Sequence, residues 1–413
     1  MPQWAEYSTG ERIKILRGER TQDELAHLAG LSPVRVRRAE QDVQLTLPTL
    51  LALSDALSAD VSVILGQQAP RRGLGHEDRQ MLRRLSHTVH DTAAGILQQD
   101  DEAPTVAELR AAVDRCWDLY WDGRYAEAGA VAAPLVRSAA ARLHDQPDGA
   151  RAGAHGLLAD AYRVAAYVSN LLGQRDLAYT AIGHARSESA AAADDLRQAL
   201  VDSGRAWIYL RDARLPDALR LAEKAAADIE PRFSRATVEQ LTVYGSHVNF
   251  AAVVASRMGD KERSADLLSQ SHAAGARMGG EHRAHGTLFG PVSATTQAVG
   301  INVALGKAGQ ALDLAGSVTP DDEAELSQAA QRRYALDRAM AQADTRRWDD
   351  ALDTLEEALT ASPEWARHQA LPQVIVDKVG RASTARLRRV STLIGARETA
   401  PTGFATATSR TAL

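Results

Sequence analysis

The sequence predicts an all-α protein in which a small domain of five helices is followed by a long array of helical hairpins. The composition favours helices, because alanine is the commonest residue and aromatic residues make up only 5% of the 413 positions. Helix-capping residues recur through the first 66 positions. Beyond residue 104, a tight turn followed by an alanine recurs along the chain.

The first 66 residues carry clear start and stop signals for helices. Thr21 and Glu24 have the spacing of a capping box at the start of the second helix, and Gly30 ends that helix in a left-handed conformation. Ser32 is the expected N-cap of the third helix, and Pro33 takes its first position, where a missing N–H costs nothing. The other helices are expected over residues 9–17, around LPTLLALSDAL and around DVSVIL.

A short turn that contains glycine joins the second and third helices. This arrangement is typical of the helix-turn-helix pattern, in which the second member of the pair lies in the major groove of DNA. The whole segment from Gly10 to Gly66 resembles the repressor-type (Xre, Cro/C1-like) helix-turn-helix domain. We therefore expect residues 1–66 to form a DNA-binding domain.

The resemblance implies roles for individual residues. It implies that Arg17 pairs with Glu40, which ties the first helix to the third, and that Gln22 contacts a phosphate. Positions on the third helix would face base edges or the flanking backbone. The full set of DNA contacts expected in this way is Gln22, Ser32, Pro33, Val34, Arg35, Arg37 and Arg38.

The sequence departs from this family at Pro33 and Val34, where polar residues are commoner. Both side chains offer only apolar contact, for example to a thymine methyl group, so we expect discrimination between bases to depend on Arg37 or Arg38 pairing with guanine. Gln41 also replaces the usual glycine after the third helix. A simpler interpretation is that the arginines are only the solvated face of an amphipathic helix, although the full-length resemblance favours DNA binding.

Charge predicts that DNA binding is local and needs two copies of the domain. The formal net charge of the chain is −5, and residues 1–66 contain seven Lys or Arg against nine Asp or Glu. Non-specific affinity for DNA comes mostly from phosphate neutralisation by basic residues. A single domain should therefore bind weakly, and we expect a homodimer that reads two half-sites on double-stranded DNA.

Residues 104–396 are predicted to form a solenoid of helical hairpins. Alanines mark the start of the second helix of each hairpin at intervals of 50, 40, 47, 46 and 40 residues. They are Ala128, Ala178, Ala218, Ala265, Ala311 and Ala351. A small residue lets the two helices cross closely, and a lone hairpin must stack on neighbours to bury its apolar face. The pattern resembles tetratricopeptide repeats, with periods longer than the standard 34 residues.

The two regions together resemble a large group of transcription regulators from GC-rich Gram-positive bacteria. Within that group, the segment GTLFGPVSATTQAVG looks like an FGP-containing signature, from which this chain departs at Val292, Ser293 and Gln297. Residues 67–103 are expected to hold a linker and a connecting helix, and residues 397–413 to be a disordered tail.

Polar side chains in the first helix of each hairpin are the candidates for effector binding, because solenoids bind partners in a concave groove lined by these helices. The candidates are Arg163, Tyr167, Asn170, Arg205, Tyr209, His247, Asn249, Gln297 and Asn302. Asparagines suit a peptide, since one amide pairs with both the donor and the acceptor of an extended backbone. The effector stays open between a peptide, a small molecule and a protein. A single residue of this kind is more often a surface or interhelical residue, and it is the set that outlines a groove.

No pattern in the sequence predicts catalysis, a cofactor or a metal site. The lone cysteine, Cys116, lies in an apolar run and is expected in the core. His87 with His90, and His282 with His285, have a one-face spacing, but neither pair brings the ligands that a stable metal site needs. HExxH, GxSxG and GxxxxGK[ST] motifs are absent, and we expect no enzyme activity.

Taken together, the sequence predicts a sequence-specific DNA-binding transcription regulator with a repeat domain that senses an effector. The start of the chain has no signal-peptide pattern and no run of eighteen apolar residues occurs, so we expect a cytoplasmic protein without a membrane partner. The alternative is an interaction module that sequesters a partner protein, with the N-terminal domain used mainly for assembly.

Overall fold

The computed structural model describes residues 7–43, 45–66, 75–96, 104–380, 390, 393 and 394. Helices make up nearly all of its regular structure, which confirms an all-α fold at that level, and one small antiparallel sheet accompanies them within the described residues. No helix in these ranges is both long and apolar enough to cross a membrane. Of residues 67–103, expected to form the linker and a connecting helix, 67–74 and 97–103 lie outside the described residues, as does the expected tail, 397–413.

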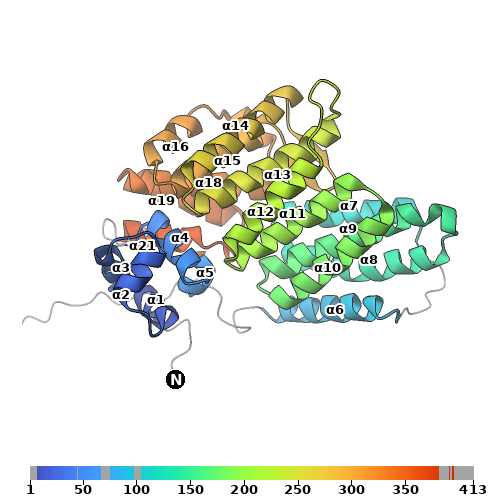
Figure 1. Ribbon diagram of the computed structural model, residues 1–413, viewed down its shortest axis with the longest axis horizontal. Helices are drawn as coiled ribbons and strands as arrows, with labels where there is room; N and C mark the ends of the chain where they lie inside the picture. The colour runs from blue at the N-terminus through green and yellow to red at the C-terminus, as the bar shows by residue number, and fades with distance from the viewer. Residues whose placement is uncertain are drawn as a thin grey trace, which may run out of the picture.

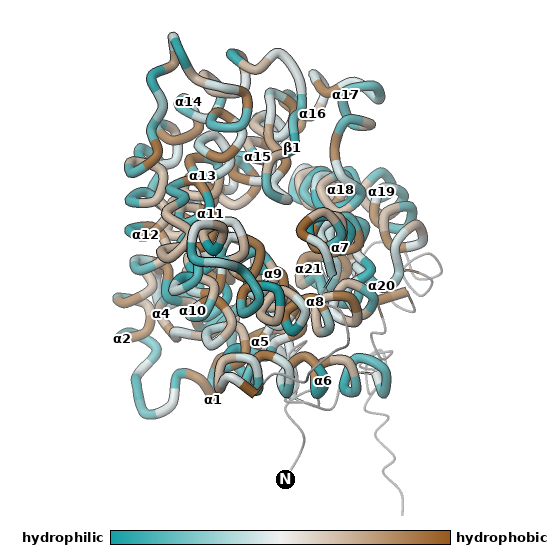
Figure 2. The backbone as a smooth tube through the Cα atoms, turned by 90° about the vertical axis from the view of Figure 1, so that its right-hand side faces the viewer, coloured by the Kyte–Doolittle hydropathy of each residue, from teal (hydrophilic) through white to brown (hydrophobic). Residues whose placement is uncertain are grey.

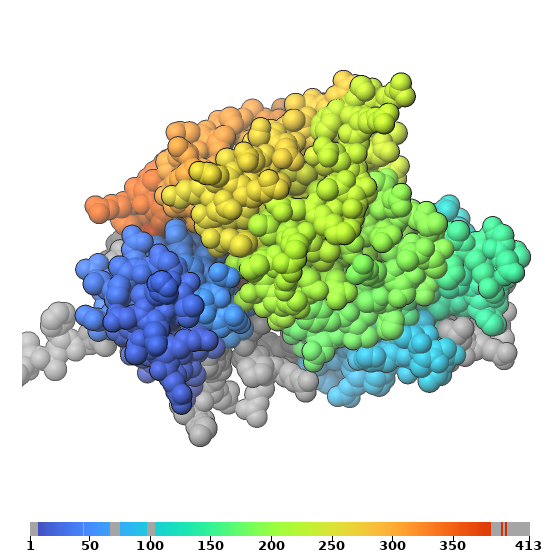
Figure 3. Space-filling view, in the orientation of Figure 1, coloured from blue at the N-terminus to red at the C-terminus, as the bar shows by residue number. Residues whose placement is uncertain are grey.

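Five short helices form a compact N-terminal unit, residues 7–66, at one end of the molecule (Figures 1 and 3). Their bounds are α1 Thr9–Arg17, α2 Gln22–Leu28, α3 Pro33–Glu40, α4 Leu47–Ala56 and α5 Val61–Ile64. The core holds Ile13, Leu25, Val36, Leu50 and Ile64, all fully buried. Burying these large aliphatic side chains supplies most of the unit's stability, about 1.5–3 kcal/mol each.

Local signals start and end these helices largely as predicted. The capping box of Thr21 and Glu24 is present, and Gly30 has a φ of +62° just after α2. Ser32 differs from the prediction: its backbone is extended as an N-cap requires, but its side chain makes no capping hydrogen bond. Pro33, at the first position of α3, supplies the start signal instead, because its fixed φ suits a helix and it has no N–H to satisfy.

Six helix pairs follow along the described chain. They are α7 Val106–Trp121 with α8 Tyr125–Asp145, α9 Arg151–Leu171 with α10 Arg175–Ala192, α11 Asp195–Arg211 with α12 Leu215–Asp228, α13 Val238–Arg257 with α14 Lys261–Met278, α15 Pro291–Ala304 with α16 Ala308–Ala315, and α18 Gln328–Asp344 with α19 Trp348–Ala361. Other elements are α6 His76–Ala93, a 3-10 turn Asp148–Ala150, β1 His282–Ala284, β2 Thr287–Phe289, α17 Pro320–Ala324, α20 Pro363–Ala366 and α21 Leu371–Val379.

The same turn joins the two helices of every pair. One residue takes a positive φ, and the next backbone N–H bonds to the carbonyl five residues earlier, as from Arg124 to Leu119 and from Arg347 to Gln342. The positive-φ residues are Gly123, Gly173, Ala213, Gly259, Gly306 and Arg346. Glycine fits this conformation because it has no Cβ, which explains why four of the six positions carry it.

A small buried residue follows each turn by five positions. Five of the six predicted alanines take this position and are fully buried: Ala128, Ala178, Ala218, Ala311 and Ala351. The prediction is wrong for the fourth pair, where Ser264 is buried and Ala265 is exposed. Serine is tolerated there because its hydroxyl bonds to the carbonyl of Asp260 in the preceding turn. The repeat is therefore set by distance from the turn rather than by alanine itself.

The helix pairs curve into a closed ring (Figure 2), with α7, α9, α11, α13, α15 and α18 around the middle. The last pair returns to the first, because α18 lies against α7. The Oε1 atom of Glu364 accepts a hydrogen bond from the backbone N–H of Ala126 at 3.2 Å, and the Trp365 side chain packs on Gly123. Helix α6, the connecting helix expected within residues 67–103, crosses the outside and packs on α8.

The N-terminal unit sits on one end of this ring. Helix α4 packs against α13 and α15, and Pro48 on α4 lies beside the turn at Gly306. Asp60, the N-cap of α5, faces Arg175 and Arg257, whose positive charges it favours. Burial lowers the pKa of Arg257 to about 10, with Arg333 adding to the effect and Asp60 opposing it. The N-terminal unit and the ring are thus held together by apolar packing and by attraction between opposite charges.

Ring closure predicts a difference between two glycines with the same backbone conformation. A methyl group at Gly123, φ +80°, would lie 2.7 Å from the Cβ of Trp365, whereas one at Gly259, φ +76°, would meet nothing within 4 Å. We expect Gly259→Ala to lower the free energy of unfolding by about 1 kcal/mol. Gly123→Ala should lower it by a further 1–3 kcal/mol, roughly the cost of overpacking. Urea unfolding of both variants measures the difference, and equal losses would contradict the closure contact.

Candidate functional site

Helix α3 presents a basic face to solvent. Pro33, Val34, Arg35, Arg37 and Arg38 are all exposed, with 52% of Val34 accessible. Val36 and Ala39 point the other way into the core, as the helical period requires. The helix packs mainly on α1 and α2, so the ring leaves this face uncovered. Ser32 is exposed at the same end of the helix.

A buried carboxylate holds α3 against the other two helices. The Glu40 side chain, 1% exposed, accepts from the Nε of Arg17 at 2.6 Å and from the Nε2 of Gln22 at 2.6 Å. The expected pair of Arg17 with Glu40 is therefore present. The Oε1 of Gln22 accepts in turn from the Nε of Arg37 at 3.5 Å. These contacts hold the N-terminus of α2 in a defined position beside the exposed arginines of α3.

Gln22 does more than the sequence suggested. It was expected to contact a phosphate, but here its amide bridges Glu40 and Arg37 inside the unit. Its position at the first residue of α2 still places it at a helix N-terminus, where the positive end of the helix dipole attracts anions. The arrangement orients Arg37 beside that N-terminus, so both features lie next to each other at one edge of the basic face.

Two of the expected effector contacts lie on the inner side of the ring. Arg163 on α9 is 1% exposed, and its guanidinium stacks over the Trp117 ring at 4.7 Å. Tyr167, one turn later on α9, packs edge-on against Trp117 and at a tilt of 31° against Trp207 on α11, with ring centroids 5.1 and 4.9 Å apart. Tyr120 completes this aromatic cluster. The ring interior here combines a buried cation with large aromatic surfaces.

His247 and Asn249, also expected to bind the effector, are buried between helices of the ring. The two ring nitrogens of His247 lie 2.7 Å from the carbonyl of Val243 and 2.8 Å from that of Ala199. Asn249 accepts from the Ser271 hydroxyl at 3.2 Å. Because α13 packs against both α11 and α14, these side chains tie the helices together and have no open side to offer a ligand.

Most of the remaining candidates contact side chains or carbonyls of their own or a neighbouring helix. Buried Asn170 accepts from Arg175 at the turn of its own pair, and Arg205 donates to the Tyr209 hydroxyl at 2.9 Å. Tyr209 packs beside Tyr179 on α10, away from the aromatic cluster. Asn302 donates to a carbonyl of its own helix, and Gln297 is half-buried on α15. These residues do not come together with Arg163 and Tyr167 at one site.

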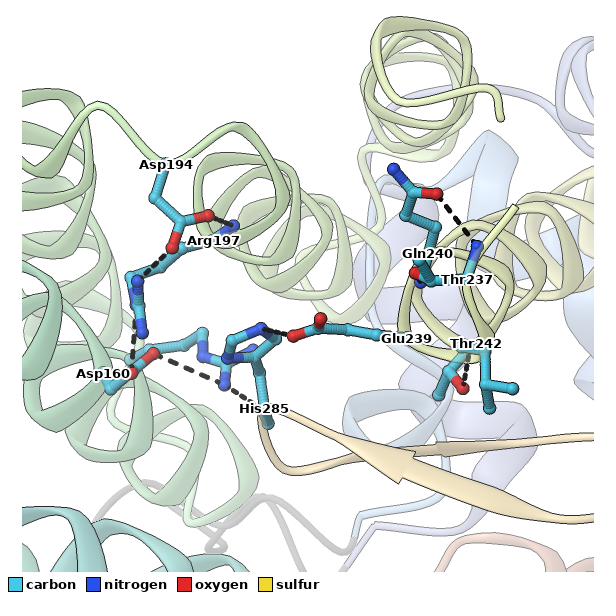
Figure 4. Close-up of polar contacts among 10 residues, drawn as sticks. Asp160, Asp194, Arg197, Thr237, Glu239, Gln240, Thr242 and His285 are labelled. Carbon is cyan, nitrogen blue, oxygen red and sulfur yellow. Dashed lines mark hydrogen bonds and ion pairs between the residues drawn. The ribbon is translucent and has the colours of Figure 1, made fainter. Parts of the chain in front are cut away.

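The structure instead adds polar residues beside Arg163 that the sequence did not single out (Figure 4). Asp160 lies one turn before Arg163 on α9, and its Oδ2 accepts from the Nε of Arg197 at 3.0 Å. Arg197 also pairs with Asp194, which lines a pocket of about 490 Å³. The pocket lining is Asp194, Asp195, Leu196, Asp228, Ile229, Glu230, Pro231, Arg232, Arg235 and Gln240. Four carboxylates and two arginines line it, and two of the carboxylates also pair with cations outside the lining, Asp194 with Arg197 and Asp228 with Lys224.

The segment between α14 and α15 is a β-hairpin whose tip, His285 and Gly286, enters the same region. Glu239, at the start of α13, pairs with the His285 ring at 2.7 Å. Glu281 accepts from the backbone N–H groups of Val292 and Ser293 at 2.9 Å and so caps α15. His285 and Glu281 therefore have separate partners, and the described residues contain no cluster of three or more potential metal ligands.

A second pocket, of about 380 Å³, lies between α6, α8, α9 and α10. Its lining includes His144, His155 and His184, and the Nδ1 of His155 lies 2.6 Å from the Oε2 of Glu188. Burial lowers the pKa of His184, with His90 adding to the effect. Cys116 is buried as predicted, and burial raises its pKa to about 12, which keeps it a thiol.

Comparison with family models, with curated proteins and with solved structures found no match to this chain.

Removing the buried carboxylate should loosen α3. Glu40→Ala leaves the donors of Arg17 and Gln22 without a shared acceptor, and we expect the N-terminal unit to lose about 2–3 kcal/mol of stability, less than for a fully buried pair because Arg17 is partly exposed. Exposed Glu19→Ala is the matched control and should change stability by less than about 0.5 kcal/mol. Hydrogen exchange of the α1 and α3 amides measures this loss of stability. Equal exchange rates in the two variants would refute the prediction.

His247 should make stability depend on pH. Burial lowers its pKa, although its two carbonyl contacts favour the charged form. In the unfolded chain histidine titrates near 6.5, so below that pH the unfolded state binds a proton that the native state does not. Stability is therefore lost as the pH falls.

Relative to His247→Gln, which cannot take up this proton, the wild type should lose about 1 kcal/mol between pH 7.5 and 5.5. Urea unfolding at the two pH values measures this difference. Parallel losses in both proteins would show that His247 is not the group responsible.

Proposed function

We propose that this protein is a sequence-specific DNA-binding transcription regulator. In this proposal the N-terminal unit is a repressor-type helix-turn-helix domain, and the ring is a tetratricopeptide-like region that binds a peptide, small-molecule or protein effector. The observation that carries the proposal is the exposed basic face of α3, held in place by Glu40 and left uncovered by the ring. The proposal includes no catalytic step or cofactor, and it assigns the protein to the cytoplasm.

The composition of the α3 face supports base reading rather than general attraction to phosphate. Arg37 and Arg38 can each pair in a bidentate manner with guanine, and Val34 offers an apolar contact for a thymine methyl group. The unit as a whole has more acidic than basic residues, so phosphate contacts alone give it little affinity. We therefore propose a homodimer in which two α3 helices read half-sites in successive turns of the major groove.

One helix runs from the hairpin tip to the side of the ring that carries the N-terminal unit. Helix α13 has 20 residues and is about 30 Å long. Its second residue, Glu239, pairs with the hairpin tip, and its last residue, Arg257, lies beside Asp60 of the N-terminal unit. A ligand that binds near the hairpin with different affinity for two positions of α13 would change how the unit is held, which is the requirement for allosteric control.

Loss of the α3 arginines should abolish specific DNA binding. Preferred duplexes are first selected from a random library with the wild-type protein, and affinity is then measured by fluorescence anisotropy at fixed salt. We expect Arg37→Ala/Arg38→Ala to bind the selected duplex at least about 30-fold more weakly, because each bidentate arginine–guanine pair contributes about 1–3 kcal/mol.

The control removes two positive charges elsewhere on the surface. Arg220→Ala/Lys224→Ala on α12 changes side chains that are 73% and 65% exposed and far from α3 in the chain. This variant should bind within about twofold of the wild type. Equal affinities for all three proteins, or a library that yields no preferred duplex, would refute the proposal and favour a protein-interaction module.

A further inference from the structure

The tip of the β-hairpin occupies the inner side of the ring as a bound peptide would. Strands β1 and β2 pair with Ala284 opposite Thr287, which leaves His285 and Gly286 as a two-residue turn. Both have positive φ, +48° and +75°, as a type I′ turn requires. This turn contacts α7 and α9, more than 120 residues earlier in the chain.

The ring holds the tip mainly through its backbone. The Nε1 of Trp121 donates to the carbonyl of Gly286 at 2.6 Å, and Arg163 donates to the carbonyl of His285. A methyl group added to Gly286 would lie 2.4 Å from the ring of Trp117. The site thus donates hydrogen bonds to two successive carbonyls of a tight turn and excludes any side chain at the second position of that turn.

Two side chains of the hairpin add polar contacts, and one of them, Arg283, adds positive charge. His285 pairs with Glu239 at 2.7 Å, and Arg283 pairs with Asp118 on α7 at 2.5 Å. Asp194 and Gln240, which help to line the pocket of about 490 Å³, lie alongside (Figure 4), and the lining also includes Asp195, Asp228 and Glu230. An occupant that extends beyond the hairpin tip would meet the carboxylates of this pocket. A basic segment matches them best, because opposite charges attract across an interface.

The tip itself is held by few contacts. Each strand has only three residues, and a two-stranded hairpin of that size is marginally stable by itself. The Arg283 and Asp118 side chains are both more than half exposed, so water screens their attraction. The base of the hairpin is firmer, because buried Phe289 packs against Gly245 of α13. The tip can therefore leave while the base stays in place.

Two buried donors beside the tip have no hydrogen-bond partner among the described residues. They are the Nε1 of Trp117 and the Nε of Arg163, on side chains that are 3% and 1% exposed. Buried donors are nearly always paired in native proteins, and each unpaired one costs free energy. A ligand with a further acceptor at this place would bind better than the hairpin tip does.

We propose that the inner face of α7 and α9 is a binding site for a short basic peptide with a glycine-containing turn, and that the hairpin tip is its built-in competitor. This inference rests on the proposed function, since it names the effector class of the ring. Binding of the peptide displaces His285 from Glu239 and so acts on the first turn of α13. The chemistry recognised is a pair of turn carbonyls flanked by an arginine and a histidine.

The test uses a cyclic peptide with the sequence of residues 281–289, closed by a disulfide between cysteines added at its ends so that the turn is kept. Binding to the full chain is measured by calorimetry without DNA. In Gly286→Val the tip cannot dock, because a β-branched side chain at this φ would meet Trp117. A tethered competitor acts at an effective concentration on the order of millimolar, so this variant should bind the peptide at least tenfold more tightly than the wild type.

Substitutions in the peptide show which of its features the site recognises. Valine in place of its glycine should abolish binding, and alanine in place of its arginine and histidine should weaken binding at least fivefold. In the Gly286→Val protein, Trp121→Phe removes the donor to the turn carbonyl and should also weaken binding at least fivefold. Trp348→Phe on α19 is the matched control and should leave binding unchanged.

The outcomes separate this inference from the proposed function. A folded Gly286→Val protein that binds the peptide no more tightly than the wild type overturns the inference, whatever the DNA experiment gives. Equal effects of Trp121→Phe and Trp348→Phe overturn it as well. If circular dichroism shows that Gly286→Val does not fold, Arg283→Ala/His285→Ala takes its place, because it weakens the docking of the tip by removing its contacts with Asp118 and Glu239 and should bind the peptide more tightly than the wild type.

Discussion

The left-handed turn that joins the two helices of each pair is the constraint on which the ring depends. It reverses the chain within a few residues, and the small residue five positions later brings the second helix close to the first. Where that residue is Ser264 instead of alanine, its hydroxyl finds a carbonyl in the same turn, so the close approach survives. Repeated along the chain, this geometry curves the pairs until Trp365 reaches Gly123 and the ring closes.

The two proposals concern opposite ends of the closed molecule. At one end α4 and Asp60 of the N-terminal unit rest on the turns of the ring, and the basic face of α3 points to solvent. At the other, the hairpin between α14 and α15 reaches the aromatic cluster around Trp117. Helix α13 touches both ends, through Arg257 and Glu239, and is packed on α11 and α14 along its length. A long packed helix transmits a shift because its neighbours limit how far it can deform.

Local signals made much of the site region predictable. The capping box at Thr21, the glycine at Gly30 and Pro33 act over three or four residues, so they fix α2 and α3 in any context. The pairing of Arg17 with Glu40 followed from resemblance alone, since no local rule joins residues 23 positions apart. The groove was predicted poorly. His247 and Asn249 looked like groove residues, but interhelical packing buries them, and a hydrophobic period does not say which polar residue faces a neighbouring helix.

The helices, most of their turns and the exposed arginines of α3 could be predicted from the amino-acid sequence, because propensity, caps and periodicity are properties of short segments. The meeting of Arg163, Trp121 and Gly286 could not be predicted, since their contacts join segments 122 and 165 residues apart and depend on the curvature that six helix pairs accumulate. No short-range pattern contains that curvature: small rotations between neighbouring pairs add up only in the folded ring.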